Sequence, residues 1–334
     1  MNNSKDILID NWGRQVNYLR IAVTDRCNLR CFYCMPEEGI NYLPKKELLT
    51  YEELLRLAKI VSELGVNKIR LTGGEPFIRR DFILFLDQLN QISGIDSIHL
   101  TTNGVLTHKY LDELKKVGVK SVNLSLDTLD RDKFHKITRR DELPKVLKTL
   151  DGLLERDILT KINMVVMAEH NIDDIIPMVE LSQYKPIEVR YIEEMPFNGD
   201  GDHNVSLSWD HKKILQTIKD KYPDVEPLEH DFNSTSKRYQ VKGFVGSFGI
   251  IPAFSRTFCN TCNRLRITSQ GTIKTCLYDD GVLDLKEHMR AGVDDNKIKQ
   301  LLKTVIGKRA KDGFEAEANR KAVSINESMS SIGG

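Results

Sequence analysis

Six short segments in the first two thirds of the chain alternate between apolar and polar residues. In the first segment, Leu19, Ile21 and Val23 alternate with Arg20 and Thr24. Successive side chains of a β-strand point to opposite faces, so this period of two predicts strands that are apolar on one face and polar on the other. The same pattern predicts strands at about residues 18–24, 68–72, 97–101, 121–126, 161–167 and 187–192.

Helical patterns lie between the predicted strands. The clearest covers residues 51–64, where Thr50 and Glu53 have the spacing of a capping box. Six repeated strand–helix steps imply parallel strands joined by right-handed crossovers, which build either a doubly wound sheet or a barrel. Further helices are predicted near residues 81–92, 108–117, 144–155 and 173–182.

The polar face of these strands favours the barrel. Parallel strands covered on both faces are usually apolar throughout, whereas here one face can pack against helices and the other must line a shared interior. Buried polar groups need partners, so this interior should hold a polar ligand. Unless several of its cations lie at strand ends and reach solvent, their excess requires an anion. By this count the interior carries Arg20, Lys68, Arg70, Lys161 and Arg190 against Glu188 alone.

The composition excludes some classes of protein but does not identify a reaction. The 334 residues carry a net charge of +1 and include no apolar run long enough to cross a membrane. The near-neutral charge argues against broad nucleic-acid binding, and the first residues lack the pattern of a signal peptide. We therefore expect a cytoplasmic protein with no membrane and no nucleic-acid partner. After about Phe197 the character of the sequence changes, so we predict two domains, residues 1–196 and 197–334.

All six cysteines fall into two groups of three. Disulfides need an oxidising compartment, of which the sequence gives no sign, and a structural zinc ion usually takes four ligands. Three thiolates around an iron–sulfur cluster leave one iron open to bind another molecule. The spacing of the first group suits such a cluster, whereas the second, taken alone, is also common in zinc ribbons. The groups are Cys27, Cys31 and Cys34, and Cys259, Cys262 and Cys276.

Distinctive loops follow the predicted strands at their C-terminal ends, where β/α barrels carry catalytic residues. The first is the cysteine loop, with Tyr33 before its last cysteine, and the second is Gly-Gly-Glu-Pro at residues 73–76. Together they resemble the radical S-adenosylmethionine superfamily. The resemblance implies an incomplete (β/α)6 barrel of the triosephosphate-isomerase type, with a C-terminal extension that carries a second cluster.

Further motifs narrow the resemblance. The stretch from Cys259 to Arg266, followed by Cys276 and the terminal Gly333-Gly334, is similar to the GTP 3′,8-cyclase family of molybdenum cofactor biosynthesis. The similarity runs from about residue 19 to the end of the chain. It departs from the family at residue 270, where glutamine stands in a turn that usually carries aspartate.

The narrower resemblance implies a lyase with two [4Fe–4S] clusters that uses S-adenosylmethionine. Reductive cleavage of S-adenosylmethionine gives a 5′-deoxyadenosyl radical, which takes hydrogen from C3′ of GTP. A C3′–C8 bond then forms, and the product is 3′,8-cyclo-7,8-dihydroguanosine 5′-triphosphate, the first step toward molybdopterin. The resemblance also implies an external low-potential electron donor and a downstream cyclic pyranopterin monophosphate synthase. It leaves open whether the chain is a monomer or a homodimer.

The resemblance assigns roles to single residues as well. The first cluster is assigned to the first cysteine group and the second cluster to the second group. The contacts to S-adenosylmethionine are Tyr33, Gly74, Ser125 and Met195. The contacts to GTP are Arg20, Arg70, Thr101, Lys161, Arg264, Leu265 and Arg266. The catalytic set is Arg20, Arg264, Arg266, Gly333 and Gly334.

Other functions fit parts of the sequence. A peptide-modifying radical enzyme would carry an auxiliary cluster too, but such enzymes usually have more cysteines near the C-terminus and need no cationic interior. A non-catalytic zinc or nucleic-acid module would also use Cys-x-x-Cys pairs, and the purified protein would be colourless rather than brown. A terminal glycine pair is either a frayed end or a thread through a space too narrow for side chains.

Overall fold

Six parallel strands form the centre of the fold, in sequence order and side by side. The computed structural model describes residues 6–197, 208–229, 231–321 and 327–333. All six predicted strands are confirmed, with bounds within two residues of the expected ones. They are β1 (Tyr18–Ala22), β2 (Lys68–Thr72), β3 (Ser97–Thr102), β4 (Ser121–Ser125), β5 (Leu159–Val166) and β6 (Glu188–Glu193).

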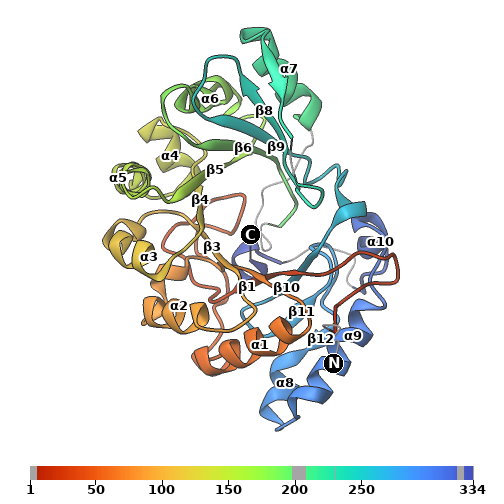
Figure 1. The fold of residues 1–334 in the computed structure, drawn as a ribbon. Coiled ribbons are helices and arrows are strands. Elements are labelled where there is room, and N and C mark those ends of the chain that lie inside the picture. Colours follow the sequence, from red (N-terminus) through yellow and green to blue (C-terminus); the bar gives the residue numbers. More distant parts are fainter. Residues whose placement is uncertain (1–5, 198–207, 230, 322–326, 334) are drawn as a thin grey trace.

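Helices cover the outer side of this sheet (Figure 1). The predicted capping box opens the first helix, where Thr50 Oγ1 accepts from the Glu53 amide and the Glu53 carboxylate accepts from the Thr50 amide. Among these covering helices the sequence pattern misses α4, because in its eight residues the apolar side chains Phe134 and Ile137 stand among charged ones. The covering helices are α1 (Tyr51–Glu63), α2 (Phe82–Asn90), α3 (Leu111–Val117), α4 (Arg131–Thr138), α5 (Leu143–Glu155) and α6 (Ile175–Tyr184).

The region after β6 extends the same sheet at both edges. Strand β9 (Ser247–Ile251) pairs in parallel with β6, and β10 (Arg264–Ile267) pairs in parallel with β1. The result is a curved sheet of twelve strands in the order β12-β11-β10-β1-β2-β3-β4-β5-β6-β9-β8-β7. The predicted incomplete barrel is therefore confirmed, whereas the predicted boundary at residues 196 and 197 stays a prediction. The added antiparallel strands are β7 (Val225–Pro227), β8 (Lys237–Val241), β11 (Thr272–Lys274) and β12 (Leu283–Asp284).

Five helices of the C-terminal region complete the described elements. Among them α9 buries Ile298, Leu302 and Ile306, and the last helix returns the chain to the centre of the curved sheet (Figure 1). None of the helices described has both the length and the apolar character needed to cross a membrane. The five are α7 (His211–Lys221), α8 (Leu285–Arg290), α9 (Asp295–Ile306), α10 (Gly313–Ala318) and α11 (Met329–Ile332), and short 3-10 turns lie at Lys45–Glu47, Pro76–Ile78, Thr107–Lys109, Ile172–Asp174 and Cys259–Thr261.

Strand parity divides the side chains of the sheet between a core and an interior. Leu19 and Ile21 of β1 belong to the apolar core between the sheet and the helices. Arg20, between them in sequence, points to the concave side, where it lines a cavity. The same alternation in the other strands produces the polar interior that the sequence predicts.

Candidate active site

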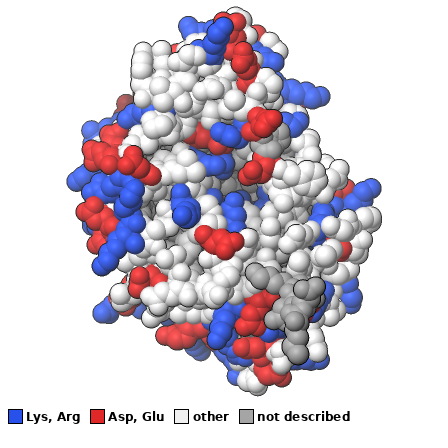
Figure 2. Space-filling model, viewed as in Figure 1, with Lys and Arg blue, Asp and Glu red and all other residues white. Residues whose placement is uncertain are grey.

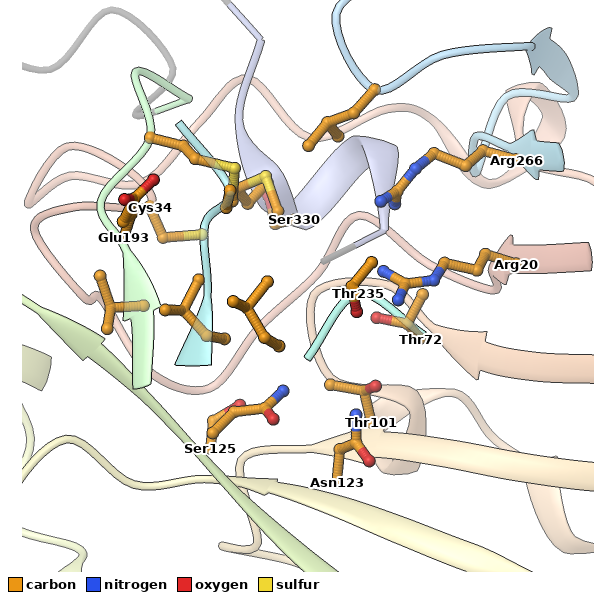
Figure 3. Close-up of a pocket in the computed structure, with 18 of the residues that line it drawn as sticks. Arg20, Cys34, Thr72, Thr101, Asn123, Ser125, Glu193, Thr235, Arg266 and Ser330 are labelled. Carbon is orange, nitrogen blue, oxygen red and sulfur yellow. The ribbon is translucent and has the colours of Figure 1, made fainter. Parts of the chain in front are cut away.

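Both cysteine groups face one cavity at the C-terminal ends of the parallel strands. The cavity has a volume of about 290 Å³ and is lined by all six cysteines, none of which forms a disulfide. The first group follows β1, the second flanks β10 and β11, and the pairing of β10 with β1 brings the two groups to the same opening. Figure 3 shows Arg20 and Arg266 pointing into this cavity from adjacent strands, with Cys34 across from them.

The first cysteine loop is held by backbone hydrogen bonds to α4. The amides of Arg30 and Phe32 donate to carbonyls of residues 138 and 137. The Cys27 sulfur accepts from the Leu29 amide at 3.4 Å and from the Asn103 side-chain amide at 3.6 Å. Burial raises the pKa of the Cys27 thiol to about 12. Iron binds cysteine as the thiolate. Once Cys27 loses its proton, the hydrogen bonds from these two amides would stabilise the negative charge on its sulfur.

The second cysteine group lies among positive charges. Burial by itself would raise the pKa of Cys262, but the charges of Arg264 and Arg309 outweigh it and lower this pKa to about 6. Arg309 also donates to the Cys262 sulfur at 2.9 Å. Burial raises the pKa of Cys276 to about 11. The contrast with the first group is therefore confined to Cys262, because burial raises the pKa of Cys259 as well.

The donor sets fit iron–sulfur clusters better than single metal ions. Within the part of the chain that the structure describes, no three His, Cys, Asp or Glu side chains converge closely enough to hold one ion. Thiolates that each bind a different iron of a cluster stand farther apart than ligands that share one ion. In both groups, all three cysteines line the cavity, so each group could bind a cluster there.

The glycine-rich loop after β2 packs against the first cysteine loop. A Cβ atom on Gly74 would lie 2.2 Å from the carbonyl oxygen of Arg26, so only glycine fits. The loop continues into Glu75, whose carboxylate accepts from the amides of Phe77 and Asn103, and burial raises the pKa of Glu75 to about 7. Beside it, the four residues predicted to contact S-adenosylmethionine all line the cavity: Tyr33, Gly74, Ser125 and Met195.

A second cavity opens at the N-terminal ends of the same strands and carries the predicted cations. Its volume is about 1030 Å³, and Figure 2 shows Lys and Arg side chains around a hollow at the centre of the molecule. Arg20 and Arg264 line both cavities, so the two are continuous. The interior charge predicted from strand parity is confirmed, since this cavity is lined by Arg20, Lys68, Arg70, Lys161, Glu188 and Arg190.

Several donors in this cationic cavity have no partner among the described residues. They are Arg20 Nε and Arg264 Nε and Nη2, all buried. Three acids line this cavity, Glu188, Glu229 and Asp231, and Glu188 is already shared, because it lies 2.6 Å from Arg190 Nε and 3.5 Å from Lys161 Nζ. Unsatisfied buried guanidinium donors are costly, so an anionic ligand fits this end of the interior.

Three titratable groups of the cationic cavity, Tyr18, His99 and Lys161, have strongly shifted pKa values. Burial, together with the charge of Arg70, lowers the pKa of His99 to about 3. Burial, together with the charge of Arg190, lowers the pKa of Lys161 to about 8. Burial by itself would raise the pKa of Tyr18, but Arg70 and Arg20 lower it to about 6, and Arg70 Nε donates to the Tyr18 hydroxyl at 2.7 Å. The sequence prediction missed Tyr18, although it has the same strand parity as Arg20 and could have been found by that signal.

The predicted GTP contacts are spread over both cavities. Thr101, Arg264 and Arg266 line the cavity of the cysteines, and Arg70 and Lys161 line the cationic one. Leu265 lines neither, because it lies on the opposite face of β10 and its side chain is part of the apolar core. The predicted contact of Leu265 with GTP therefore does not involve its side chain.

The tail reaches the same opening. The carbonyl of Gly333 accepts a hydrogen bond from Arg266 Nη1. A Cβ atom on Gly333 would lie 2.8 Å from Thr72 Cγ2, which supports the size argument made from the sequence. Gly334 lies outside the described residues. The sequence prediction also missed Asp127, whose carboxylate accepts from the Tyr33 hydroxyl at 2.8 Å, and Arg309, for which local sequence gives no signal.

A partial barrel whose first strand leads into a three-cysteine loop defines the radical S-adenosylmethionine class of enzymes. The profile of the Radical SAM superfamily matches residues 21–182, and that of Molybdenum Cofactor Synthesis C matches residues 187–314. A crystal structure of Streptococcus suis SuiB bound to S-adenosylmethionine superposes with a TM-score of 0.59 over 86% of this chain and 68% of that one. At 17% identity this likeness shows the fold alone.

Relatives with similar sequences identify the family within this class of enzymes. The chain is 38% identical over 334 residues to "GTP 3′,8-cyclase, mitochondrial" of Arabidopsis thaliana, covering 100% of this chain and 85% of that protein. It is 41% identical to the "GTP 3′,8-cyclase" of Peptoclostridium acidaminophilum, covering 87% and 90%. The Drosophila melanogaster "Molybdenum cofactor biosynthesis protein 1" is 43% identical over 92% of this chain. This chain spans about half the length of that protein, 55%. The chain belongs to the GTP 3′,8-cyclase family.

Proposed function

We propose that this protein is a GTP 3′,8-cyclase that joins C3′ of the ribose of GTP to C8 of its guanine. The observation that carries the proposal is the continuous interior, which has two cysteine triads at one end and unpaired guanidinium donors at the other. Bound clusters and S-adenosylmethionine would supply the radical chemistry at the first end. The names and lengths of the Arabidopsis and Peptoclostridium relatives support the same activity.

The two triads would hold two [4Fe–4S] clusters with different tasks. Cys27, Cys31 and Cys34 lie beside the residues proposed for S-adenosylmethionine, and the Gly74 backbone approaches their loop closely. The second triad lines the cavity together with Arg264 and Arg266, so a cluster held there would lie beside these guanidinium groups. The first triad would therefore serve cofactor cleavage and the second would serve substrate binding.

The cations would bind and orient the triphosphate. Guanidinium forks match phosphate oxygens, and Arg20 has a buried donor free for one. Arg70 and Lys161 would add charge deeper in the interior. With the phosphates at the cationic end, the guanine of GTP would lie toward Arg264, Arg266 and the second triad, and Gly333 with Gly334 would close on the reacting groups.

The proposed partners follow from the chemistry. Reductive cleavage requires an external low-potential electron donor, and the cyclised product requires a consuming enzyme, here a cyclic pyranopterin monophosphate synthase. The Arabidopsis relative is named as mitochondrial, so a cytoplasmic location remains a prediction, as does assembly as a monomer or homodimer.

Isotope transfer tests the proposal directly. The reconstituted protein is incubated without oxygen with dithionite, S-adenosylmethionine and GTP carrying deuterium at C3′. The expected result is deuterium in 5′-deoxyadenosine and an equal amount of a new nucleotide that is isomeric with GTP but elutes separately. Guanosine with the same label is the control for the phosphate end. Unlabelled 5′-deoxyadenosine without a new isomer of GTP would rule the cyclase out.

A further inference from the structure

Three buried charged residues connect the N-terminal segment with the second cysteine triad. Asp10, Arg14 and Arg309 are 5%, 9% and 4% exposed. The Asp10 carboxylate accepts from the amides of Trp12 and Arg14 through one oxygen. Its other oxygen lies 2.6 Å from Arg14 Nε and 3.5 Å from Arg309 Nη1. One carboxylate thus fixes the positions of two guanidinium groups.

Both guanidinium groups donate to the second triad. Arg309 donates to the Cys262 sulfur at 2.9 Å and to the Cys262 carbonyl at 2.8 Å. Arg14 donates to the Cys259 carbonyl at 3.0 Å and to two carbonyls at residues 310 and 311. The Trp12 indole donates to the Arg309 carbonyl at 3.0 Å, which holds the Arg309 backbone as well.

The charge of this group is not balanced by its own members. Two arginines and one aspartate leave one positive charge in a buried place, which is costly without a nearby anion. The Cys262 sulfur is in direct contact with Arg309 and would carry that negative charge as a thiolate bound to iron. At the first triad, by contrast, the Cys27 sulfur receives its hydrogen bonds from the neutral amides of Leu29 and Asn103.

We infer that Arg309, held by Asp10, is a positioning residue of the second cluster and raises its reduction potential. A charged N–H···S hydrogen bond stabilises the more negative, reduced form of a cluster. The N-terminal segment is therefore part of the second cluster site, although no cysteine lies in it. This inference rests on the proposed second [4Fe–4S] cluster and assigns a task to residues that the proposed cyclisation does not otherwise use.

A redox titration of the reconstituted full chain, followed by electron paramagnetic resonance, tests the inference. Cys276→Ala identifies which transition belongs to the second cluster. In Arg309→Lys that transition should move to lower potential by at least tenfold in the ratio of reduced to oxidised cluster, about 59 mV for one electron. The first-cluster transition should not move. Asp10→Glu, which keeps the negative charge but displaces the carboxylate that anchors Arg309, should give a smaller shift in the same direction.

Arg320→Lys is the matched control. The Arg320 side chain is 5% exposed and donates to the carbonyls of Tyr278 and Asp279, but to no cysteine sulfur among the described residues. It should leave both transitions unchanged. A folded Arg309→Lys protein with wild-type iron and an unshifted second transition overturns the inference. If Arg309→Lys does not fold, an unshifted Asp10→Glu protein overturns it. A wild-type protein with about four irons instead of about eight would instead contradict the proposed second cluster.

Discussion

The two ends of the interior are built differently. The cationic end is made by side chains of the parallel strands themselves, such as Arg20, Arg70 and Lys161. The sulfur-lined end is made by loops and edge segments that are far apart in sequence, since Cys34 and Cys259 face the same cavity. Strand parity fixes the first arrangement locally, whereas the second depends on which strands pair at the edges of the sheet.

The difference between the two ends would orient a nucleotide bound in the interior. Near the sulfur-lined cavity, but not lining it, burial raises the pKa of Asp127 to about 6 and the pKa of Glu75 to about 7. At the other end Lys68, Arg70 and Lys161 line the cavity, and this excess of cations favours an anion. A nucleotide would therefore enter with its phosphates toward the cations and its base toward the second triad.

The largest expected effect comes from breaking the sulfur-lined end. Replacing Cys27, Cys31 or Cys34 by Ala should abolish cleavage of S-adenosylmethionine, measured as 5′-deoxyadenosine. Replacing Cys259, Cys262 or Cys276 should leave some uncoupled cleavage but no cyclised GTP. Iron content should fall by about half in either class, because one cluster is lost. Cyclised product from Cys276→Ala would contradict a substrate-binding role for the second triad.

The tail should rank next. Deleting Gly333 and Gly334 should lower product formation by about two orders of magnitude or more, because the tail orients reacting groups without supporting the fold. Iron content, circular dichroism and GTP affinity should stay near the wild-type values.

Gly333→Ala tests whether the tail needs a residue without a side chain at this position, because it leaves the length of the chain unchanged. Its Cβ atom would meet Thr72 Cγ2 at 2.8 Å, and its φ is +81°. Gly292→Ala is the matched control, because Gly292 has a similar φ of +78° but nothing within 4 Å of a Cβ atom. A truncated protein with full turnover would mean that the terminal glycines are a frayed end.

The cationic end should respond with smaller, selective losses. Arg20→Ala, Arg70→Ala and Lys161→Ala should each weaken GTP binding by roughly 1.5–3 kcal/mol, typical of a charge-assisted contact. Guanosine binding, measured by the same calorimetric titration, should change little. Arg290→Ala is the control, since Arg290 pairs with Glu53 on the outer surface. Equal losses for nucleotide and nucleoside would show that these residues support the barrel instead of the phosphates.

The smallest effect is a pH dependence of GTP affinity. Lys161, whose pKa burial and Arg190 lower to about 8, is charged below that pH and loses its charge above it. GTP affinity should therefore fall as the pH rises through about 8, and bound phosphate should move the midpoint upward by favouring the charged amine. Tyr18, with a pKa of about 6, has already titrated in this range.

Lys161→Arg provides the matched comparison for the pH profile. A guanidinium stays protonated throughout this range, so the variant should bind GTP with nearly constant affinity between pH 7 and pH 9. Guanosine should show no such dependence with either protein. A wild-type GTP profile that is flat across pH 8 would remove Lys161 from the phosphate site.

Local patterns in the sequence are enough to predict the six strands, their polar face and the cluster-binding loop of the first cysteine group. Because alternation is a local property, it assigns Arg20, Arg70 and Lys161 to the interior, and the observed cavity contains them. The glycine-rich loop after β2 can be predicted from the sequence in the same way, and in the structure Gly74 has no room for a side chain. The same alternation also assigns Tyr18 to the interior.

The assembly of the sulfur-lined end, by contrast, depends on contacts between distant parts of the chain. The pairing of β10 with β1 places Arg266 beside Arg20 and brings the second triad to the first. It also turns Leu265 into the core. The contact of Asp10 with Arg309 likewise joins the two ends of the sequence. Periodicity shows which face of a strand is buried, but the partner of an edge strand depends on long-range packing that no local pattern contains.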